Sequence, residues 1–123
     1  MRRNNRFFSA WPVLAAVGLA LYGMAAQAAD THYRVVENWA HFPPGVTSWG
    51  AATGVDVDRH DNVYVLNRNE TMPIMVFDRN GKFIRGWGQN MFRTTHFLRI
   101  GPSGNVWVTD RGDMQAFEFS SQG

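Results

Sequence analysis

The sequence predicts an all-β protein built from β-propeller blades, and three observations indicate this fold class. The sequence contains an internal repeat: DNVYVLNR at 61–68 is similar to GNVWVTDR at 104–111, at an offset of 43 residues. Val55, Val57, Val63 and Val65 alternate with polar or half-exposed neighbours, which is typical of half-buried strands. Turn-forming runs such as RHDN, DRNGK and GPSGN separate these stretches. A period of this length built from short strands indicates a four-stranded propeller blade.

The complete repeat is expected to contain four antiparallel strands, at about 54–58, 63–67, 74–78 and 83–87. No stretch beyond residue 28 repeats apolar residues at helical spacing over ten residues, which argues against a helical-pair repeat. We therefore expect a first blade at 49–91 and a second, incomplete blade at 92–123.

The segment before the first blade carries another copy of the outer-strand pattern. RVVENWAHF at 34–42 resembles KFIRGWGQN at 82–90, with Trp39 over Trp87. We expect residues 29–48 to supply an outer, ring-closing strand and a connector. Stacked repeats generally need three or more units to bury their faces. The sequence is therefore expected to be the N-terminal fragment of a longer protein, and the alternative is a short chain that completes a ring by oligomerising.

The first 28 residues have the pattern of a secretory signal peptide. Arg2, Arg3 and Arg6 form a positive start, an apolar stretch follows at 11–24, and AQA at 26–28 is a small-x-small cleavage site. The apolar stretch is shorter than the roughly twenty residues of a membrane-spanning helix, although an uncleaved membrane anchor is the alternative. We expect a periplasmic or secreted protein with no stable membrane insertion after cleavage.

The charge balance beyond this leader gives no reason to expect a nucleic-acid partner. Three of the twelve Lys/Arg residues lie in the leader and all ten Asp/Glu residues follow it, so nine basic residues face ten acidic ones. The chain has no cysteine. An exported domain of this kind depends on its core, a larger assembly or a metal rather than on disulfides.

The repeat resembles the NHL type of six-bladed β-propeller. GNVWVTDRGDMQAFEF at 104–119 is similar to that family's blade core, in which G-N-x-[YW]-V-x-D precedes the third strand. More specifically, residues 54–123 resemble the opening blades of bacterial relatives of peptidyl-α-hydroxyglycine α-amidating lyase. The resemblance implies about two of six blades, and a reaction that splits a carbinolamide C–N bond to give a peptide amide and glyoxylate.

Two residues match functional positions of the lyase family. Arg68 falls where the family places an arginine at the end of the second strand, and His96 where it places a zinc-ligating histidine. The resemblance implies that Arg68 stabilises a developing oxyanion and that His96 holds a zinc ion acting as a Lewis acid. It also implies a calcium site of backbone carbonyls, which would match Val55 and Leu98. THF at 95–97 stands where the family usually has Pro-His-Gly.

Both candidate residues have plainer interpretations. His96 could be a polar residue in a loop before a strand. Arg68 could pair with a blade carboxylate such as Asp110 or Asp56, since Arg111 occupies the equivalent place in the second repeat.

Two further sets of side chains are expected to be structural. The acidic set is expected to form turns or face outward: Asp56, Asp58 and Asp61. The aromatic set is expected to pack between blades or at the rim of the ring: Trp39, Trp49, Trp87 and Trp107.

The sequence leaves three functions open. The leading one is a zinc-assisted amidating lyase that acts on a small peptide-like substrate, of which residues 1–123 would be a truncated piece that is inactive alone. The second is a non-catalytic NHL propeller that binds a protein or glycan partner on its rim. The third is a six-bladed hydrolase that uses a metal in the same channel.

Overall fold

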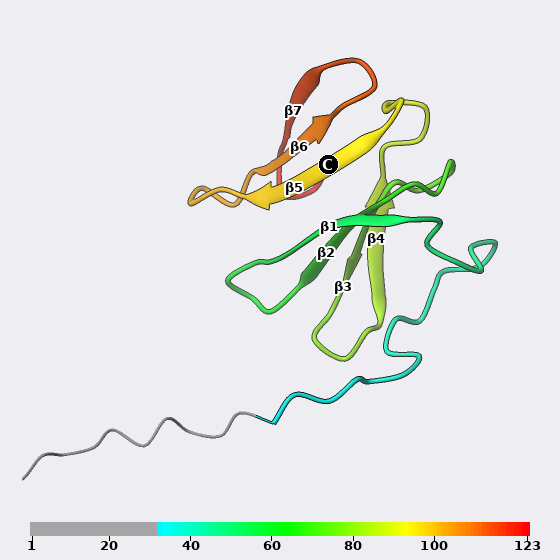
Figure 1. Ribbon diagram of the computed structural model, residues 1–123. Coiled ribbons are helices and arrows are strands. Elements are labelled where there is room, and N and C mark those ends of the chain that lie inside the picture. Colours follow the sequence, from blue (N-terminus) through cyan, green and yellow to red (C-terminus); the bar gives the residue numbers. More distant parts are fainter. Residues whose placement is uncertain (1–31) are drawn as a thin grey trace, which may run out of the picture. The chain divides into compact units, whose positions relative to one another are not determined.

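The computed structural model describes residues 32–123, so the leader predicted at 1–28 lies outside the described residues. All the strands lie within the unit Arg34–Gly123. They form two antiparallel sheets in sequence order (Figure 1). The first contains β1 (Ala52–Val57), β2 (Val63–Asn67), β3 (Ile74–Phe77) and β4 (Phe83–Trp87). The second contains β5 (Thr95–Ile100), β6 (Val106–Asp110) and β7 (Gln115–Phe119).

The all-β class and the four strands of the first repeat are confirmed. In the first sheet, β2 and β4 coincide with the predicted bounds, β3 ends one residue earlier than predicted, and β1 begins two residues and ends one residue earlier than predicted. The two sheets are consistent with propeller blades, whereas the NHL type and the number of blades in a ring stay predictions. Within residues 32–123, no helix has the length and apolar character needed to span a bilayer.

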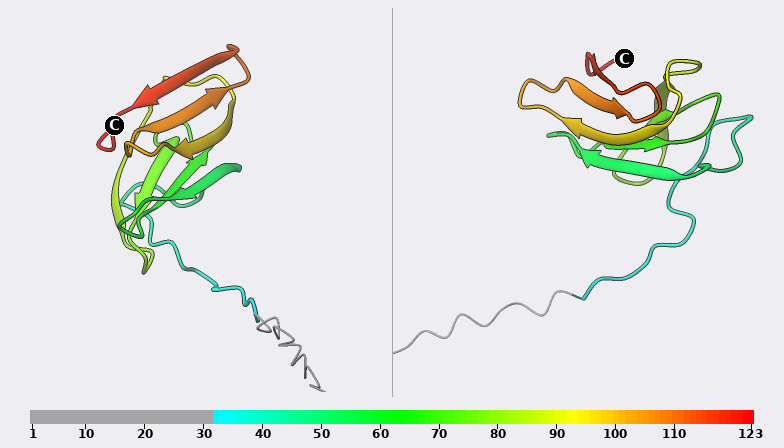
Figure 2. Two further views of the ribbon diagram at one scale, coloured as in Figure 1. Left: turned by 90° about the vertical axis from the view of Figure 1, so that its left-hand side faces the viewer. Right: turned by 45° about the horizontal axis from the view of Figure 1, so that its top comes forward.

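One face of the first sheet packs against the second sheet, and β1 lies beside β5 (Figures 1 and 2). Alternation along each strand directs one set of side chains into this junction. The first sheet contributes Tyr64, Leu66, Ile74 and Val76, and the second contributes Leu98, Val106 and Val108. These side chains are at most 1% exposed, so the junction is a dry apolar core.

The opposite face of the first sheet is covered by the segment before β1. Val65, Met75 and Phe77 form a second buried cluster with Val46. The aromatic rings that cover this cluster come from Trp39, Phe42 and Trp49. Strands β2 and β3 are therefore buried on both faces, which explains their nearly continuous apolar sequences.

The segment 34–48 forms no strand of either sheet, and its one ladder contact is an isolated parallel bridge between His41 and Lys82. The ring-closing role predicted for residues 29–48 stays a prediction. The structure nevertheless gives Trp39 and Trp87 equivalent surroundings. Trp39 lies on the turn at Gly81, as Trp87 lies on the turn at Gly123.

Trp87 and Trp107 differ in how deeply their side chains are buried. Trp87 lies between the two sheets, with ring centroids 6.5 Å from Tyr64 and 5.9 Å from Phe119, so its predicted packing role is confirmed. Trp107 points away from this core and is 45% exposed, on the face of the second sheet that no other sheet of residues 32–123 covers.

Gly81→Ala is expected to lower the free energy of unfolding by about 2 kcal/mol. Gly81 has a φ of +82°, and a methyl group there would lie 1.7 Å from the Trp39 carbonyl oxygen. Gly104→Ala is the matched control, because Gly104 has a φ of +88° with nothing within 4 Å of the added carbon. Urea unfolding should show the smaller loss for Gly104→Ala. Equal losses would mean that backbone strain alone, and not the Trp39 contact, requires glycine at the first turn.

Candidate functional site

The loop after β2 and the loop before β5 lie at the same end of the two sheets and enclose a hollow of about 400 Å³. Polar and charged side chains dominate its lining, which includes Asn67, Arg68, Glu70, Arg93, Thr94 and Thr95. Arg68, one of the sequence-predicted site residues, therefore lines a concave surface between the sheets.

Arg68 directly follows β2, and its backbone N–H donates to the Ala51 carbonyl oxygen over 3.0 Å. Arg111 in the second sheet makes the equivalent bond to Thr94 over 2.9 Å. This backbone anchor explains why the strand ends are alike in the two repeats. The Arg68 side chain is exposed, and it makes no ion pair with any carboxylate in the described part of the chain.

The carboxylate Asp56, proposed as a structural partner for Arg68, is engaged elsewhere. It accepts a hydrogen bond of 2.9 Å from the Ile100 N–H and lies 3.8 Å from the Arg99 guanidinium. The prediction that Asp56 faces outward or forms a turn is wrong, since it joins β1 to β5 across the junction of the sheets. Sequence alternation could not show this, because the bond depends on how closely two sheets stack.

His96 lies within β5 rather than in a loop before it. The pairing of β5 with β6 shifts between Thr95 and Phe97, so His96 is the extra residue of a β-bulge. Thr53 occupies the same place in the first sheet, where the pairing shifts between Ala52 and Gly54. Bulges are frequent beside active sites because they redirect a side chain. His96 is exposed, so its imidazole is accessible to a ligand.

The backbone segments that carry Arg68 and His96 meet through the residues that precede them, and His96 is not among the residues that line the hollow. The Thr95 hydroxyl donates to the Asn67 carbonyl oxygen over 3.1 Å, across the junction of the two sheets. Each candidate residue directly follows one partner of this hydrogen bond, although the two candidates are 28 positions apart in the sequence.

Zinc sites in proteins use three or four side-chain ligands. Among residues 32–123, no group of three or more His, Cys, Asp or Glu side chains is placed to hold a metal ion. The described residues therefore do not assemble a zinc site by themselves, and zinc binding by His96 stays a prediction.

The two residues suggested for a calcium site occupy equivalent positions in adjacent strands. Val55 lies in β1 and is 64% exposed, whereas Leu98 lies in β5 and is 1% exposed. The strands approach closely here, because a methyl group on Gly54 would lie 2.8 Å from the Leu98 nitrogen. The backbones are neighbours, and calcium binding by their carbonyls stays a prediction.

Two buried polar residues anchor the loops around the hollow: Asn67, which the sequence did not single out, and Asp110, which it offered only as a partner for Arg68. Asp110 accepts hydrogen bonds from the N–H groups of Arg93 (2.7 Å), Thr94 (2.9 Å) and Asp113 (3.0 Å). Burial opposes ionisation, but these backbone hydrogen bonds outweigh it and hold the pKa of Asp110 below its ordinary value. The carboxylate therefore fixes the loop that leads into β5.

Asn67 is the equivalent residue of the first repeat, 43 positions earlier. Its amide group donates to the carbonyls of Met72 (3.3 Å) and Pro73 (3.0 Å), and its oxygen accepts from the Asn69 N–H (2.7 Å). The sequence signal that could have identified Asn67 and Asp110 is the recurrence of a short polar side chain at the end of an apolar strand. Both residues are at most 2% exposed and act as anchors for the loops that form the hollow.

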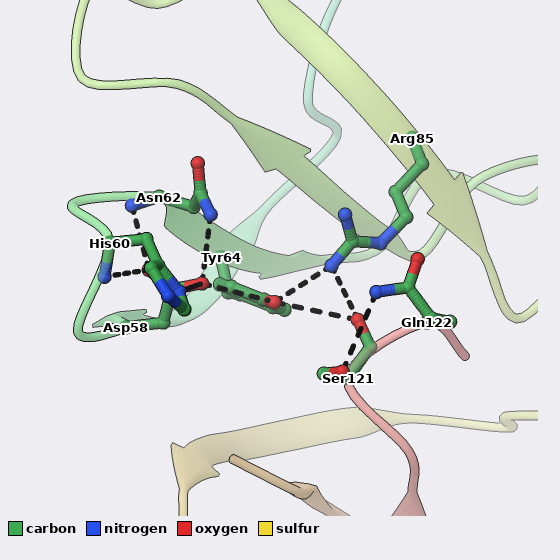
Figure 3. Close-up of polar contacts among 7 residues, drawn as sticks. All are labelled: Asp58, His60, Asn62, Tyr64, Arg85, Ser121 and Gln122. Carbon is green, nitrogen blue, oxygen red and sulfur yellow. Dashed lines mark hydrogen bonds and ion pairs between the residues drawn. The ribbon is translucent and has the colours of Figure 1, made fainter.

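The opposite end of the sheets carries a second polar cluster, shown in Figure 3. Asp58 accepts hydrogen bonds from the N–H groups of His60 (2.8 Å) and Asn62 (2.9 Å), which confirms its prediction as a turn-forming residue. Burial opposes its ionisation, but the bonds from Asn62 and His60 hold the pKa of Asp58 below its ordinary value.

Arg85 and Tyr64 link this turn to the second sheet. Arg85 donates to the Tyr64 hydroxyl over 2.8 Å and also to the Ser121 carbonyl (Figure 3). Burial raises the pKa of the Tyr64 hydroxyl, and the opposing charge of Arg85 does not reverse the shift. The cluster joins β2, β4 and the residues after β7, so it clamps the sheets at the end away from Arg68.

The fold defines a class of protein, an all-β repeat consistent with propeller blades. No family model matches the chain. It is similar to peptidyl-alpha-hydroxyglycine alpha-amidating lyase 2 of Drosophila melanogaster, with 33% identity over 109 residues, covering 69% of this chain and 26% of that protein. It is also similar to lyase 1 of the same name and organism, with 31% identity over 75 residues, covering 61% of this chain and 14% of that protein. The chain thus spans about a quarter or less of these relatives.

Proposed function

We propose that this chain forms part of a peptidyl-α-hydroxyglycine α-amidating lyase with zinc-assisted chemistry. The observation that carries the proposal is the placement of Arg68 and His96 on two segments joined by a buried hydrogen bond. The likeness to two proteins named as such lyases supports it. Because His96 is one candidate ligand without partners in residues 32–123, we propose that residues outside this sequence complete the site and that the chain alone is inactive.

The proposed reaction converts a peptidyl-α-hydroxyglycine into a peptide amide and glyoxylate. The proton of the carbinol hydroxyl is removed, a C=O bond forms, the C–N bond breaks, and the amide nitrogen takes up a proton. Zinc would supply Lewis acidity that eases loss of the hydroxyl proton. Arg68 would stabilise the negative charge on that oxygen, since a guanidinium stays charged at any physiological pH. His96 would contribute an imidazole ligand.

The proposed surroundings follow from the leader and the chemistry. The signal-peptide pattern of residues 1–28 supports a periplasmic or secreted protein, and the partner would be a small peptide-like substrate that enters the hollow beside Arg68. A hollow of about 400 Å³ is large enough for the end of a peptide.

Arg68→Ala is expected to lower kcat/KM for glyoxylate release from α-hydroxyhippurate by about a hundredfold, because a developing charge loses its partner. The assay uses the full-length protein, with its zinc content measured in parallel. Arg111→Ala is the matched control, since Arg111 is also exposed, follows the equivalent strand and makes the same backbone bond. We expect this control to retain full activity.

His96→Ala is expected to lower the zinc content of the same protein. A wild-type protein that releases no glyoxylate and contains no zinc would contradict the lyase proposal and favour the non-catalytic propeller. A His96→Ala protein with undiminished zinc would instead remove His96 from the ligand set.

A further inference from the structure

The hydrogen bond between Thr95 and Asn67 is buried on both sides. Thr95 is 3% exposed and Asn67 is 0% exposed, so water does not compete for the contact of 3.1 Å. The bond runs from the start of β5 in the second sheet to the end of β2 in the first. It therefore ties the two sheets together at the edge of the hollow that Arg68 and Thr95 line.

A second hydroxyl lies beside this bond. Thr53 Oγ1 lies 3.4 Å from Thr95 Oγ1 and 3.5 Å from the Leu66 carbonyl oxygen. Because Thr95 directs its hydrogen to Asn67, its oxygen is left to accept a hydrogen bond from Thr53. Both Thr53 distances are long for an O–H···O hydrogen bond, and its single hydrogen can serve one acceptor, so the bond from Thr95 to Asn67 is the contact that joins the sheets here.

Strand pairing in the repeat does not require a hydroxyl at this position. The residue equivalent to Thr95 in the first sheet is Ala52, 43 positions earlier, and it is exposed. Ala52 pairs with Asn67 just as Thr95 pairs with Asp110. Because alanine is sufficient for strand pairing in the first sheet, pairing within the second sheet does not explain the Thr95 hydroxyl. The hydrogen bond that this hydroxyl donates lies at the junction of the two sheets.

We propose that Thr95 is a positioning residue that sets the placement of Arg68 relative to His96. Arg68 is the next residue after Asn67, and His96 is the next residue after Thr95. Loss of the hydroxyl removes the direct bond between the end of β2 and the start of β5, so the backbones that carry Arg68 and His96 lose the contact that fixes their spacing. The consequence for catalysis rests on the proposed lyase function, whereas the structural coupling does not.

The test compares Thr95→Val, which keeps the side-chain shape without the hydroxyl, with Thr95→Ser, which keeps the hydroxyl. Amide hydrogen exchange by NMR is measured at Arg68, whose N–H donates to the Ala51 carbonyl and reports opening at the end of β2. We expect exchange at Arg68 to be about tenfold faster in Thr95→Val, because a buried carbonyl loses its donor. Thr95→Ser should stay within about twofold of the wild type.

Thr109→Val is the matched control, because Thr109 is a half-buried threonine in the neighbouring strand β6. It should leave exchange at Arg68 unchanged. The Asp78 N–H, which donates to the Lys82 carbonyl in the β3–β4 turn, reports loosening of the whole sheet. Unchanged exchange at Arg68 in Thr95→Val, or an equal acceleration at Asp78, would overturn the positioning role.

Activity supplies the second readout. In the full-length protein, Thr95→Val is expected to lower kcat/KM for glyoxylate release about tenfold, with Thr95→Ser restoring it. Full activity in Thr95→Val would overturn the catalytic part of the inference. Absence of glyoxylate release from the wild type would instead count against the lyase function, and the exchange at Arg68 would still decide whether Thr95 couples the sheets.

Discussion

Phe77→Ala is expected to lower the free energy of unfolding by about 4 kcal/mol, the largest effect that we expect of a single substitution in this chain. Phe77 is 0% exposed. Its ring centroid lies between 5.4 and 6.4 Å from the rings of Trp39, Phe42, Trp49 and Phe83. Alanine would leave a cavity that rigid β3 cannot close. Since a domain has roughly 5–15 kcal/mol of stability in total, this loss is a large share of it.

Urea unfolding followed by tryptophan fluorescence measures this loss directly, because Trp39 and Trp49 contact Phe77. Phe97→Ala is the matched control, since Phe97 is 49% exposed on the uncovered face of the second sheet. We expect the control to cost about 1 kcal/mol or less. A Phe77→Ala loss as small as that of the control would show that the segment before β1 does not pack on the first sheet.

Asp110→Asn is expected to lower the free energy of unfolding by about 3 kcal/mol at neutral pH. The side chain is 2% exposed, and its two oxygens face backbone N–H groups of Arg93, Thr94 and Asp113. Asparagine replaces one acceptor oxygen by an NH₂ group, which points a donor at another donor. The loop that carries Arg93 and leads into β5 would lose its anchor.

The pH dependence of stability provides the measurement for Asp110. Its pKa is held below the ordinary value of 3.8 in the folded chain, so the folded state favours the ionised carboxylate. This contribution is fully present above about pH 4 and is lost as the pH falls through the folded pKa. Asp110→Asn should therefore lose less stability between about pH 5 and pH 2 than the wild type does. Parallel pH curves for the two proteins would contradict this account.

Asn67→Asp is the reciprocal control. The Asn67 amide group donates to the carbonyls of Met72 and Pro73, so a carboxylate there would face two oxygens. We expect this variant to be less stable than the wild type at neutral pH and to recover as the pH falls, because protonation restores a donor. The two equivalent positions should thus respond to pH with opposite sign.

The strand pattern was predictable because it is local. Val63 and Val65 recur with the period of a strand, and runs such as DRNG demand a turn, so the bounds of β2 and β4 follow from neighbouring residues. The intervening Tyr64 and Leu66 are buried as well, because β2 is covered on both faces. The offset of 43 residues further determined that a second sheet repeats the first. The packing partners of each sheet could not be predicted from the sequence. Alternation shows which face of a strand a side chain occupies, but it does not show which segment covers that face.

The sequence predicted individual residues of the candidate site but not how they are arranged. Arg68 and His96 were found by resemblance, yet the repeat could not show that His96 is the extra residue of a bulge. The polar contacts that support them were also missed. The bond from Thr95 to Asn67 spans 28 residues, and the bond from Ile100 to Asp56 spans 44. Such contacts depend on the stacking of two sheets.

By itself, the sequence determined an all-β chain, its strand-and-turn order and the equivalence of its two repeats, because these depend on period, turn chemistry and propensity within a few residues. Only the tertiary structure decided that the segment around Trp39 covers one face of the first sheet, and that Asp110 and Asn67 anchor the loops of the hollow. The physical reason is that buried hydrogen bonds and dry apolar contacts form between surfaces, and their partners are chosen by geometry that appears after the sheets have packed.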